Sequence, residues 1–130
     1  MKYLGIDYGA KRVGIALSDD SGSVAFPHGM FPNDARLLDA VSALAREKGI
    51  GAVVMGESKD KDGNDNPVME DARRFAARVE EALSIPVHFE LEYYSSFEAR
   101  RHADDSFVDA RAAAVILNRY LERIRKSPAS

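Results

Sequence analysis

Residues 4–17 constrain the fold more than any other stretch, because two alternating apolar runs flank a short turn there. Apolar residues at every second position of the first run form one side of a β-strand. Asp7 falls on the other side of that strand, beside Gly5. Gly9-Ala10 allows a tight reversal, and the alternation resumes at Val13. The sequence therefore predicts a β-hairpin with an acid near its centre.

Asp7 is the unusual residue of this hairpin. A carboxylate on an apolar strand is costly to bury unless a cation or hydrogen-bond donors compensate it. One interpretation is a metal ligand. The other is a turn acid that bonds its own backbone, as Asp often does before Gly. The hairpin alone leaves both interpretations open.

The composition limits the classes of protein and of metal site. The chain has 130 residues, 45% apolar and 30% charged, so we expect one domain over residues 1–126 and a flexible tail over 127–130. It has no cysteine, so a metal would need oxygen or imidazole ligands. No apolar run approaches the roughly 20 residues that cross a bilayer, and no signal-peptide core is present. We expect a cytoplasmic protein without a membrane partner.

The distribution of charge is uneven. The net charge of −3 argues against a strongly basic nucleic-acid footprint over the whole chain. Residues 1–96 carry 11 basic and 16 acidic side chains, whereas residues 97–130 carry 7 basic and 5 acidic ones. The C-terminal quarter could therefore form a local basic face.

After the hairpin, the patterns predict a third, bent strand and then alternating helices and strands. Asn33 or Asp34 is expected to cap the first helix, and Asn66 to cap the second, with Pro67 at its first position. The expected elements are a strand over 24–31, a helix over 37–48, a strand over 50–55, a helix over 67–83, a strand over 85–92, a short helix from 95 or 96 to 100, and a helix from about 109.

A polar loop is predicted over residues 57–66, where it could cover a site at the end of the preceding strand. Asp60, Asp62 and Asn64 match the first three ligand positions of a calcium loop. However, Asp65 replaces the required glycine, and Asp71 replaces the final glutamate. We interpret the segment as a solvated loop. Lys59 or Lys61 is a candidate contact for a phosphate.

Two further acids stand out. Glu92 ends the last predicted strand, and Asp109 lies on the core-facing stripe of the last helix. Asp109 could simply be a first-turn acid that the helix dipole favours, by about 0.3–1 kcal/mol. The predicted architecture is a mixed five-stranded α/β sheet, a three-strand meander plus two parallel strands, flanked by helices. In that sheet the two acids could meet Asp7 in an oxygen-only site for Mg²⁺ or Mn²⁺.

The chain resembles a known family, the small RNase H-like proteins described as pre-16S rRNA nucleases and also as Holliday junction resolvases. The resemblance rests on the opening hairpin (5–16), on Glu92-Tyr93-Tyr94-Ser95-Ser96-Phe97-Glu98-Ala99, and on the closing helix (108–117). It implies an RNase H-like fold, with Asp7, Glu92 and Asp109 as the catalytic acids that bind Mg²⁺ or Mn²⁺.

The resemblance also implies a function. It suggests a metal-dependent endonuclease that processes the 16S rRNA precursor in ribosome biogenesis, with ribosomal particles as possible partners and a monomer or homodimer as the acting form. Resolution of Holliday junctions in DNA recombination or repair is the alternative substrate. The candidate nucleic-acid contacts are Lys11, Arg12, Lys59 and Arg111, although Lys11 and Arg12 could also be ordinary exposed turn charges.

The chain departs from the family pattern after the fourth predicted strand, where Gly56-Glu57-Ser58 replaces the frequent Gly-Leu-Pro, and around Glu92. The second departure allows a third interpretation. The family usually has Asp-Glu-Arg where this chain has Leu91-Glu92-Tyr93, so the protein could be a nucleic-acid-binding module with weakened catalysis. A sugar-kinase or actin-like ATPase is a further rival, because its phosphate-binding hairpin begins with a similar Asp-x-Gly pattern. Such an ATPase needs a second lobe, for which 130 residues leave no room.

Overall fold

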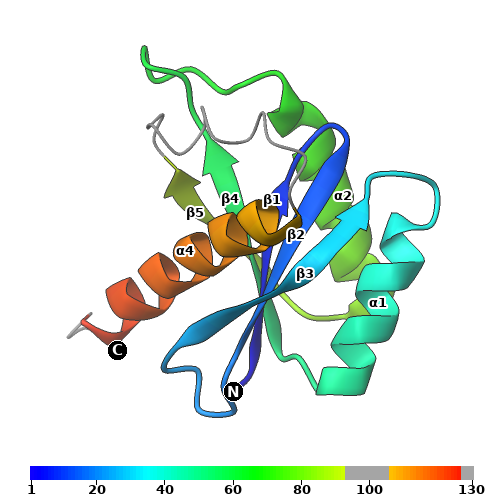
Figure 1. Ribbon diagram of the computed structural model, residues 1–130, viewed down its shortest axis with the longest axis vertical. Helices are drawn as coiled ribbons and strands as arrows, with labels where there is room; N and C mark the ends of the chain where they lie inside the picture. Colours follow the sequence, from blue (N-terminus) through cyan, green and yellow to red (C-terminus); the bar gives the residue numbers. More distant parts are fainter. Residues whose placement is uncertain (93–105, 127–130) are drawn as a thin grey trace.

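The computed structural model describes residues 1–92 and 106–126, in which one five-stranded sheet lies between helices (Figure 1). The first three strands form an antiparallel meander, and β4 and β5 run parallel to β1. The strand order is β3-β2-β1-β4-β5, which confirms the predicted mixed sheet. The elements are β1 (Tyr3–Tyr8), β2 (Arg12–Ser18), β3 (Ala25–Pro32), α1 (Leu37–Lys48), β4 (Ala52–Ser58), α2 (Val68–Leu83), β5 (Val87–Glu92) and α4 (Ser106–Arg125).

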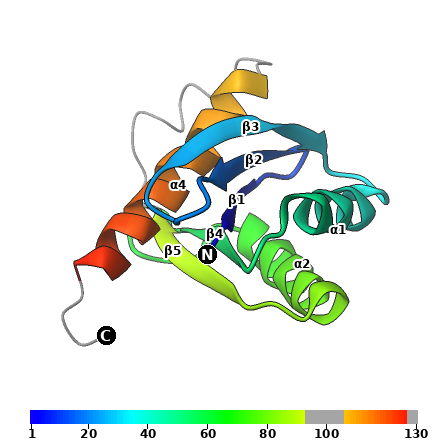
Figure 2. The same cartoon turned by 90° about the horizontal axis from the view of Figure 1, so that it is seen from below.

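The sheet separates two apolar layers, and Figure 2 shows helices on both of its faces in a view from below. Helices α1 and α2 cover one face, where Leu4 and Ile6 are fully buried. Helix α4 covers the other face and buries Leu117. The period-2 alternation of β1 divides its residues between these layers, so Gly5 and Asp7 face α4.

Close packing of α4 on the sheet depends on a strand glycine. A Cβ on Gly5 would lie 2.9 Å from Leu117 Cβ and 3.0 Å from the Ala113 carbonyl oxygen. Glycine in a strand often marks such an approach of another backbone. The helix can therefore lie directly on β1 at this point.

Several predicted boundaries and caps differ from the structure. Strand β4 runs to Ser58 rather than ending before Gly56, because it stays paired with β5. Helix α4 begins at Ser106, before the predicted start. The expected bend of β3 is confirmed as a register shift opposite Ile15/Ala16. The predicted short helix from 95 or 96 to 100 lies outside the described residues.

The predicted side-chain caps are wrong. Arg36 and Pro67 occupy the N-cap positions of α1 and α2, and neither makes a side-chain cap hydrogen bond. Asp34 instead accepts a hydrogen bond from the Arg36 N–H in a tight turn. Asn66 donates its side-chain amide to Ser58 Oγ at 2.6 Å, a contact across the loop that local sequence does not reveal.

Among the described helices, none is both long and apolar enough to cross a lipid bilayer.

Candidate active site

Asp7 lies near the end of β1, on the face of the sheet that α4 covers. Its side chain is buried, with 5% of its surface exposed. In the β1–β2 ladder Asp7 is the partner of Gly14, and cross-strand partners point to the same face of a sheet. The absence of a side chain at Gly14 therefore leaves the space beside Asp7 to another element.

Asp109 fills that space. It lies in the first turn of α4, and a Cβ on Gly14 would collide with the Asp109 carbonyl oxygen. Gly14 thus contacts the backbone of Asp109 on one side and pairs with Asp7 on the other. The sequence prediction that Asp109 faces the core is confirmed, since only 6% of it is exposed.

The Asp109 carboxylate lies against a cation from β2. Arg12 Nε is 2.7 Å from Asp109 Oδ2, but the two groups are not aligned as a hydrogen bond. Oδ2 is buried and accepts no hydrogen bond from the described residues. Arg12 therefore balances the charge of this buried oxygen, and a metal ion or a donor from a ligand would compete with Arg12 for it.

Glu92 ends β5, and its carboxylate reaches back over β4. Glu92 Oε2 lies 2.9 Å from the point that a Cβ on Gly56 would occupy. Glu92 and Asp7 both open into one cavity of about 270 Å³ at the carboxyl ends of the central strands. The other residues that line it are Tyr8, Gly9, Ala10, Gly56, Ser58, Asn66, Val68 and Met69.

The three predicted acids thus lie on one face and at one end of the sheet, but only two of them line the same cavity. Asp7 and Glu92 line one cavity. The backbone of Asp109 contacts Gly14, the cross-strand partner of Asp7. Within the described residues, no three acidic or imidazole side chains are arranged as a preformed site for one ion. Mg²⁺ is commonly held by one or two carboxylates together with water and substrate phosphates, so this set of oxygen donors fits that ion.

Another buried acid of β5 has a structural role. Glu90 is 7% exposed, and its Oε1 accepts hydrogen bonds from Arg123 Nε at 3.0 Å and Nη2 at 2.6 Å. These bonds raise the pKa of the Arg123 guanidinium. Arg123 also lies over the ring of Tyr120, at 5.3 Å from its centroid. Glu90 therefore ties β5 to α4 beside the candidate site.

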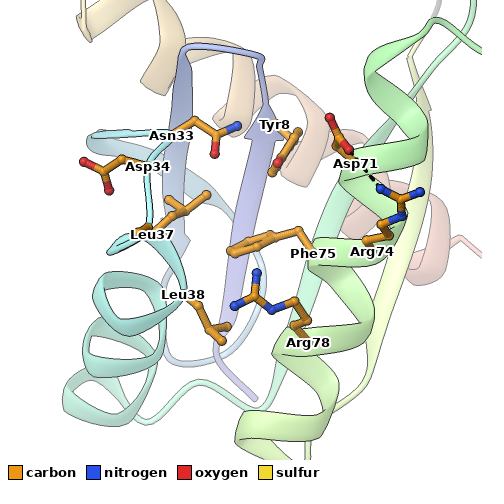
Figure 3. A pocket seen from close by; sticks show the side chains of 10 residues that line it. Tyr8, Asn33, Asp34, Leu37, Leu38, Asp71, Arg74, Phe75 and Arg78 are labelled. Carbon is orange, nitrogen blue, oxygen red and sulfur yellow. Dashed lines mark ion pairs between the residues drawn. The ribbon is translucent and has the colours of Figure 1, made fainter.

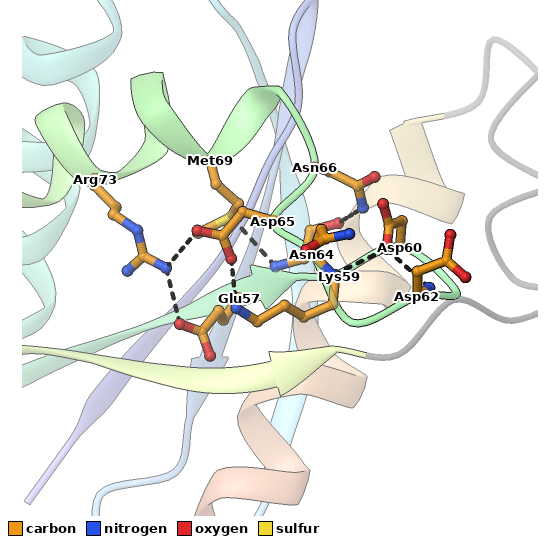
Figure 4. Close-up of polar contacts among 10 residues, drawn as sticks. Glu57, Lys59, Asp60, Asp62, Asn64, Asp65, Asn66, Met69 and Arg73 are labelled. Atoms are coloured by element: carbon orange, nitrogen blue, oxygen red, sulfur yellow. Dashed lines mark hydrogen bonds and ion pairs between the residues drawn. The ribbon is translucent and has the colours of Figure 1, made fainter.

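Lys59 belongs to an ion network at the base of the loop between β4 and α2 (Figure 4). Its Nζ lies 2.5 Å from Asp65 Oδ1, and Arg73 bridges Asp65 and Glu57. The hydrogen bond that Lys59 donates to Asp65 raises the pKa of Lys59 and lowers the pKa of Asp65. A nucleic-acid phosphate would compete with Asp65 for Lys59.

The residues that match a calcium loop instead form hydrogen bonds within this segment. Asp60 Oδ1 accepts hydrogen bonds from the backbone N–H groups of Asp62 and Asn64, each at 2.9 Å. The acid at the first position therefore stabilises the turn, in agreement with a solvated loop.

The remaining predicted cationic contacts lie around the acids. Lys11 is exposed in the β1–β2 turn, directly after the cavity residues Gly9 and Ala10. Arg111 is exposed on α4, two residues beyond Asp109. Both positions are compatible with contacts to a nucleic-acid backbone at the mouth of the cavity.

The sequence reasoning missed the residues that create the space. In the sequence, Gly14 and Gly56 are only small residues within apolar strands. Strand glycines also occur at bulges and bends, so the pattern does not identify a close approach. Ser58 and Asn66 line the cavity and bond each other. The sequence pattern predicts a loop and a helix cap at these two positions instead.

Comparisons with known proteins identify the family of this chain. A family model described as RuvX, Holliday junction resolvase, matches residues 1–123. A "Putative pre-16S rRNA nuclease" of Oleidesulfovibrio alaskensis is 39% identical over 133 residues, which cover 93% of this chain and 92% of that protein. A protein of the same name from Nitratidesulfovibrio vulgaris is 36% identical over 120 residues, covering 91% and 84%.

Solved structures support the fold. Thermus thermophilus RuvC superposes with a TM-score of 0.60 at 13% identity and covers 96% of each chain. The fowlpox virus Holliday junction resolvase gives 0.53 at 14% identity, covering 95% of this chain and 99% of that one. At such identities the likeness shows the fold alone. With the family match and the relatives above, it places this chain in the RuvX family of Holliday junction resolvase-like nucleases, with a RuvC-like, RNase H-like fold.

Proposed function

We propose that this protein is a divalent-metal-dependent endonuclease that cleaves the precursor of 16S rRNA. The observation that carries the proposal is the cavity shared by Asp7 and Glu92, with Asp109 next to Asp7 across Gly14. The names of the relatives support the substrate. The family description favours a second candidate substrate, a four-way DNA junction.

Asp7, Glu92 and Asp109 would hold Mg²⁺ or Mn²⁺. When bound, such ions activate the attacking water and stabilise the leaving oxygen in phosphodiester hydrolysis. A water oxygen bonds to phosphorus, and the bond between phosphorus and the 3′ oxygen breaks. The products carry a 5′-phosphate and a 3′-hydroxyl, which takes up a proton.

The chain's own residues orient the substrate. The exposed side chains of Lys11 and Arg111 would contact backbone phosphates of the substrate, and Lys59 would join them after leaving Asp65. Arg12 contacts Asp109 and balances its buried charge. Such cations position a nucleic acid without reading its sequence.

The decisive experiment compares Asp7→Asn with the unchanged protein on a precursor rRNA fragment and a four-way DNA junction, each with Mg²⁺, Mn²⁺ or EDTA. We expect metal-dependent cleavage of the RNA and at least a 10³-fold loss in Asp7→Asn, because removal of one ligand carboxylate weakens the metal site. Asp39→Asn on the exposed side of α1 is the matched control and should retain activity.

The outcomes separate the candidate functions. Full activity in Asp7→Asn would refute the role of the acids. Cleavage of the junction alone would replace the RNA substrate by DNA. Binding that falls steeply with salt, without a product under any metal, would favour the binding module that the departures at Leu91 and Tyr93 suggest.

A further inference from the structure

A second cavity, of about 400 Å³, lies between α1 and α2 on the face of the sheet opposite α4 (Figure 3). Its lining includes side chains from both helices and the end of β1. Tyr8 lines this cavity and also the cavity of the acids. The two hollows are therefore neighbours, on either side of the carboxyl end of β1.

The floor of this cavity is apolar and aromatic. Tyr8 and Phe75 pack with ring centroids 5.5 Å apart at an angle of 38°. Leu37 and Leu38 of α1 face them across the cavity in Figure 3. Aromatic rings at a cavity floor offer a stacking surface for an unpaired nucleobase, which every base can use through its flat face.

One wall of the cavity supplies a cation. Arg74 is engaged by acids of its own helix, with Glu70 Oε1 at 2.6 Å and Asp71 Oδ1 at 3.6 Å. Arg78, one turn further along α2, makes no ion pair within residues 1–92 and 106–126. Its guanidinium extends over the cavity in Figure 3. It could therefore contact a phosphate without first breaking a salt bridge.

We propose that the α1–α2 cavity binds an unpaired nucleotide of the substrate, with its base against Tyr8 and Phe75 and its phosphate at Arg78. The inference rests on the proposed nuclease function. Since Tyr8 follows Asp7 directly and their side chains point to opposite faces, a strand passing over the end of β1 reaches both cavities. The enzyme would then favour cleavage sites where a duplex meets a single strand.

The test uses a duplex with an unpaired extension that carries 2-aminopurine, whose fluorescence falls when the base stacks. The same duplex with its extension fully paired is the comparison, and EDTA prevents cleavage. We expect quenching on binding, and about a tenfold loss of affinity for the extended duplex in Arg78→Ala. The paired duplex should lose less than twofold.

Two further variants separate the cavity from general charge. Arg119→Ala removes an exposed arginine of α4, on the other face of the sheet, and should leave the preference for the extension intact. Leu38→Phe narrows the cavity without a change of charge and should weaken quenching. Circular dichroism checks that each variant is folded.

The results distinguish failure of this inference from failure of the nuclease proposal. Equal effects of Arg78→Ala and Arg119→Ala on both duplexes, or unchanged fluorescence on binding, would overturn the cavity proposal even if the protein cleaves RNA. Quenching that depends on Arg78, with no cleavage under any metal, would support the nucleotide site and overturn the nuclease. The absence of any binding would overturn both.

Discussion

The contact between Gly14 and Asp109 allows α4 to place Asp109 next to Asp7 of β1, so Gly14→Ala is an informative change. A new Cβ would collide with the Asp109 carbonyl oxygen. That atom is backbone, so no rotamer change can relieve the overlap. The start of α4 would have to move away from β2, and Asp109 would move away from Asp7.

The size of the effect follows from two opposing terms. Forcing an extra carbon into a packed site costs about 1–3 kcal/mol, and a backbone collision belongs at the upper end. Replacing Gly by Ala also lowers the entropy of the unfolded chain, which stabilises the native state by about 0.4–1 kcal/mol. The free energy of unfolding should therefore fall by about 2 kcal/mol. In a domain of this size, that lowers Tm by about 6–10 °C.

Gly29→Ala in β3 provides the matched control. A Cβ at Gly29 would meet no atom within 4 Å, and the residue has no positive φ. Its free energy of unfolding should stay unchanged or rise by up to about 1 kcal/mol. Urea and thermal unfolding followed by circular dichroism measure both variants. A Gly14→Ala protein as stable as Gly29→Ala would show that α4 does not rest on β2 at this point.

Three other changes test neighbouring parts of the structure. Arg123→Ala leaves the buried Glu90 carboxylate without its guanidinium partner. The free energy of unfolding in urea should therefore fall by about 1–3 kcal/mol. No fall would show that the pair has no structural role. Backbone N–H groups lower the pKa of Asp19 below its ordinary 3.8, so its contribution to stability is present above that pH and disappears as the pH falls through the lowered value. In Asp19→Asn, the free energy of unfolding should fall less steeply as the pH is lowered, measured by unfolding curves over a pH series. The same fall in both proteins would show that Asp19 does not contribute this stability. Gly56→Ala would press on Glu92 Oε2 and Ile116 Cδ1, and it should weaken Mn²⁺ binding about tenfold in calorimetric titration while the circular dichroism spectrum stays native; unchanged affinity would remove Glu92 from the proposed metal site.

The architecture was predictable because its determinants are local. The alternation over residues 4–17 specifies a hairpin with two different faces, and the apolar run before Gly56 indicates a strand covered on both sides. The helix caps were not predictable for the opposite reason. Asn66 has the right side chain for a cap, but its amide bonds Ser58 across the loop. A partner eight residues away decides its role, and no propensity of Asn encodes that contact.

The chemistry of the site was partly predictable for a related reason. A lone acid in an apolar pattern is visible in the sequence, and the three predicted acids do lie at one end of one face of the sheet. The space between them is invisible, because a glycine gives the same signal in a turn, a bulge or a close approach. Only the strand register shows that Gly14 lies beside Asp7, and only the position of α4 shows what fills the gap.

The same period of two explains why one strand can serve two cavities. Consecutive residues of a strand point to opposite faces, so Asp7 points to the α4 side and lines the cavity of the acids. Tyr8 points to the side of α1 and α2 and borders both cavities. A change that slipped β1 by one residue would exchange these positions, burying the carboxylate among the aliphatic side chains around Ile6. The apolar layer that fixes the register therefore also keeps the acid on the α4 side and the aromatic ring on the side of α1 and α2. Selection for stability and selection for the site thus act on the same alternation.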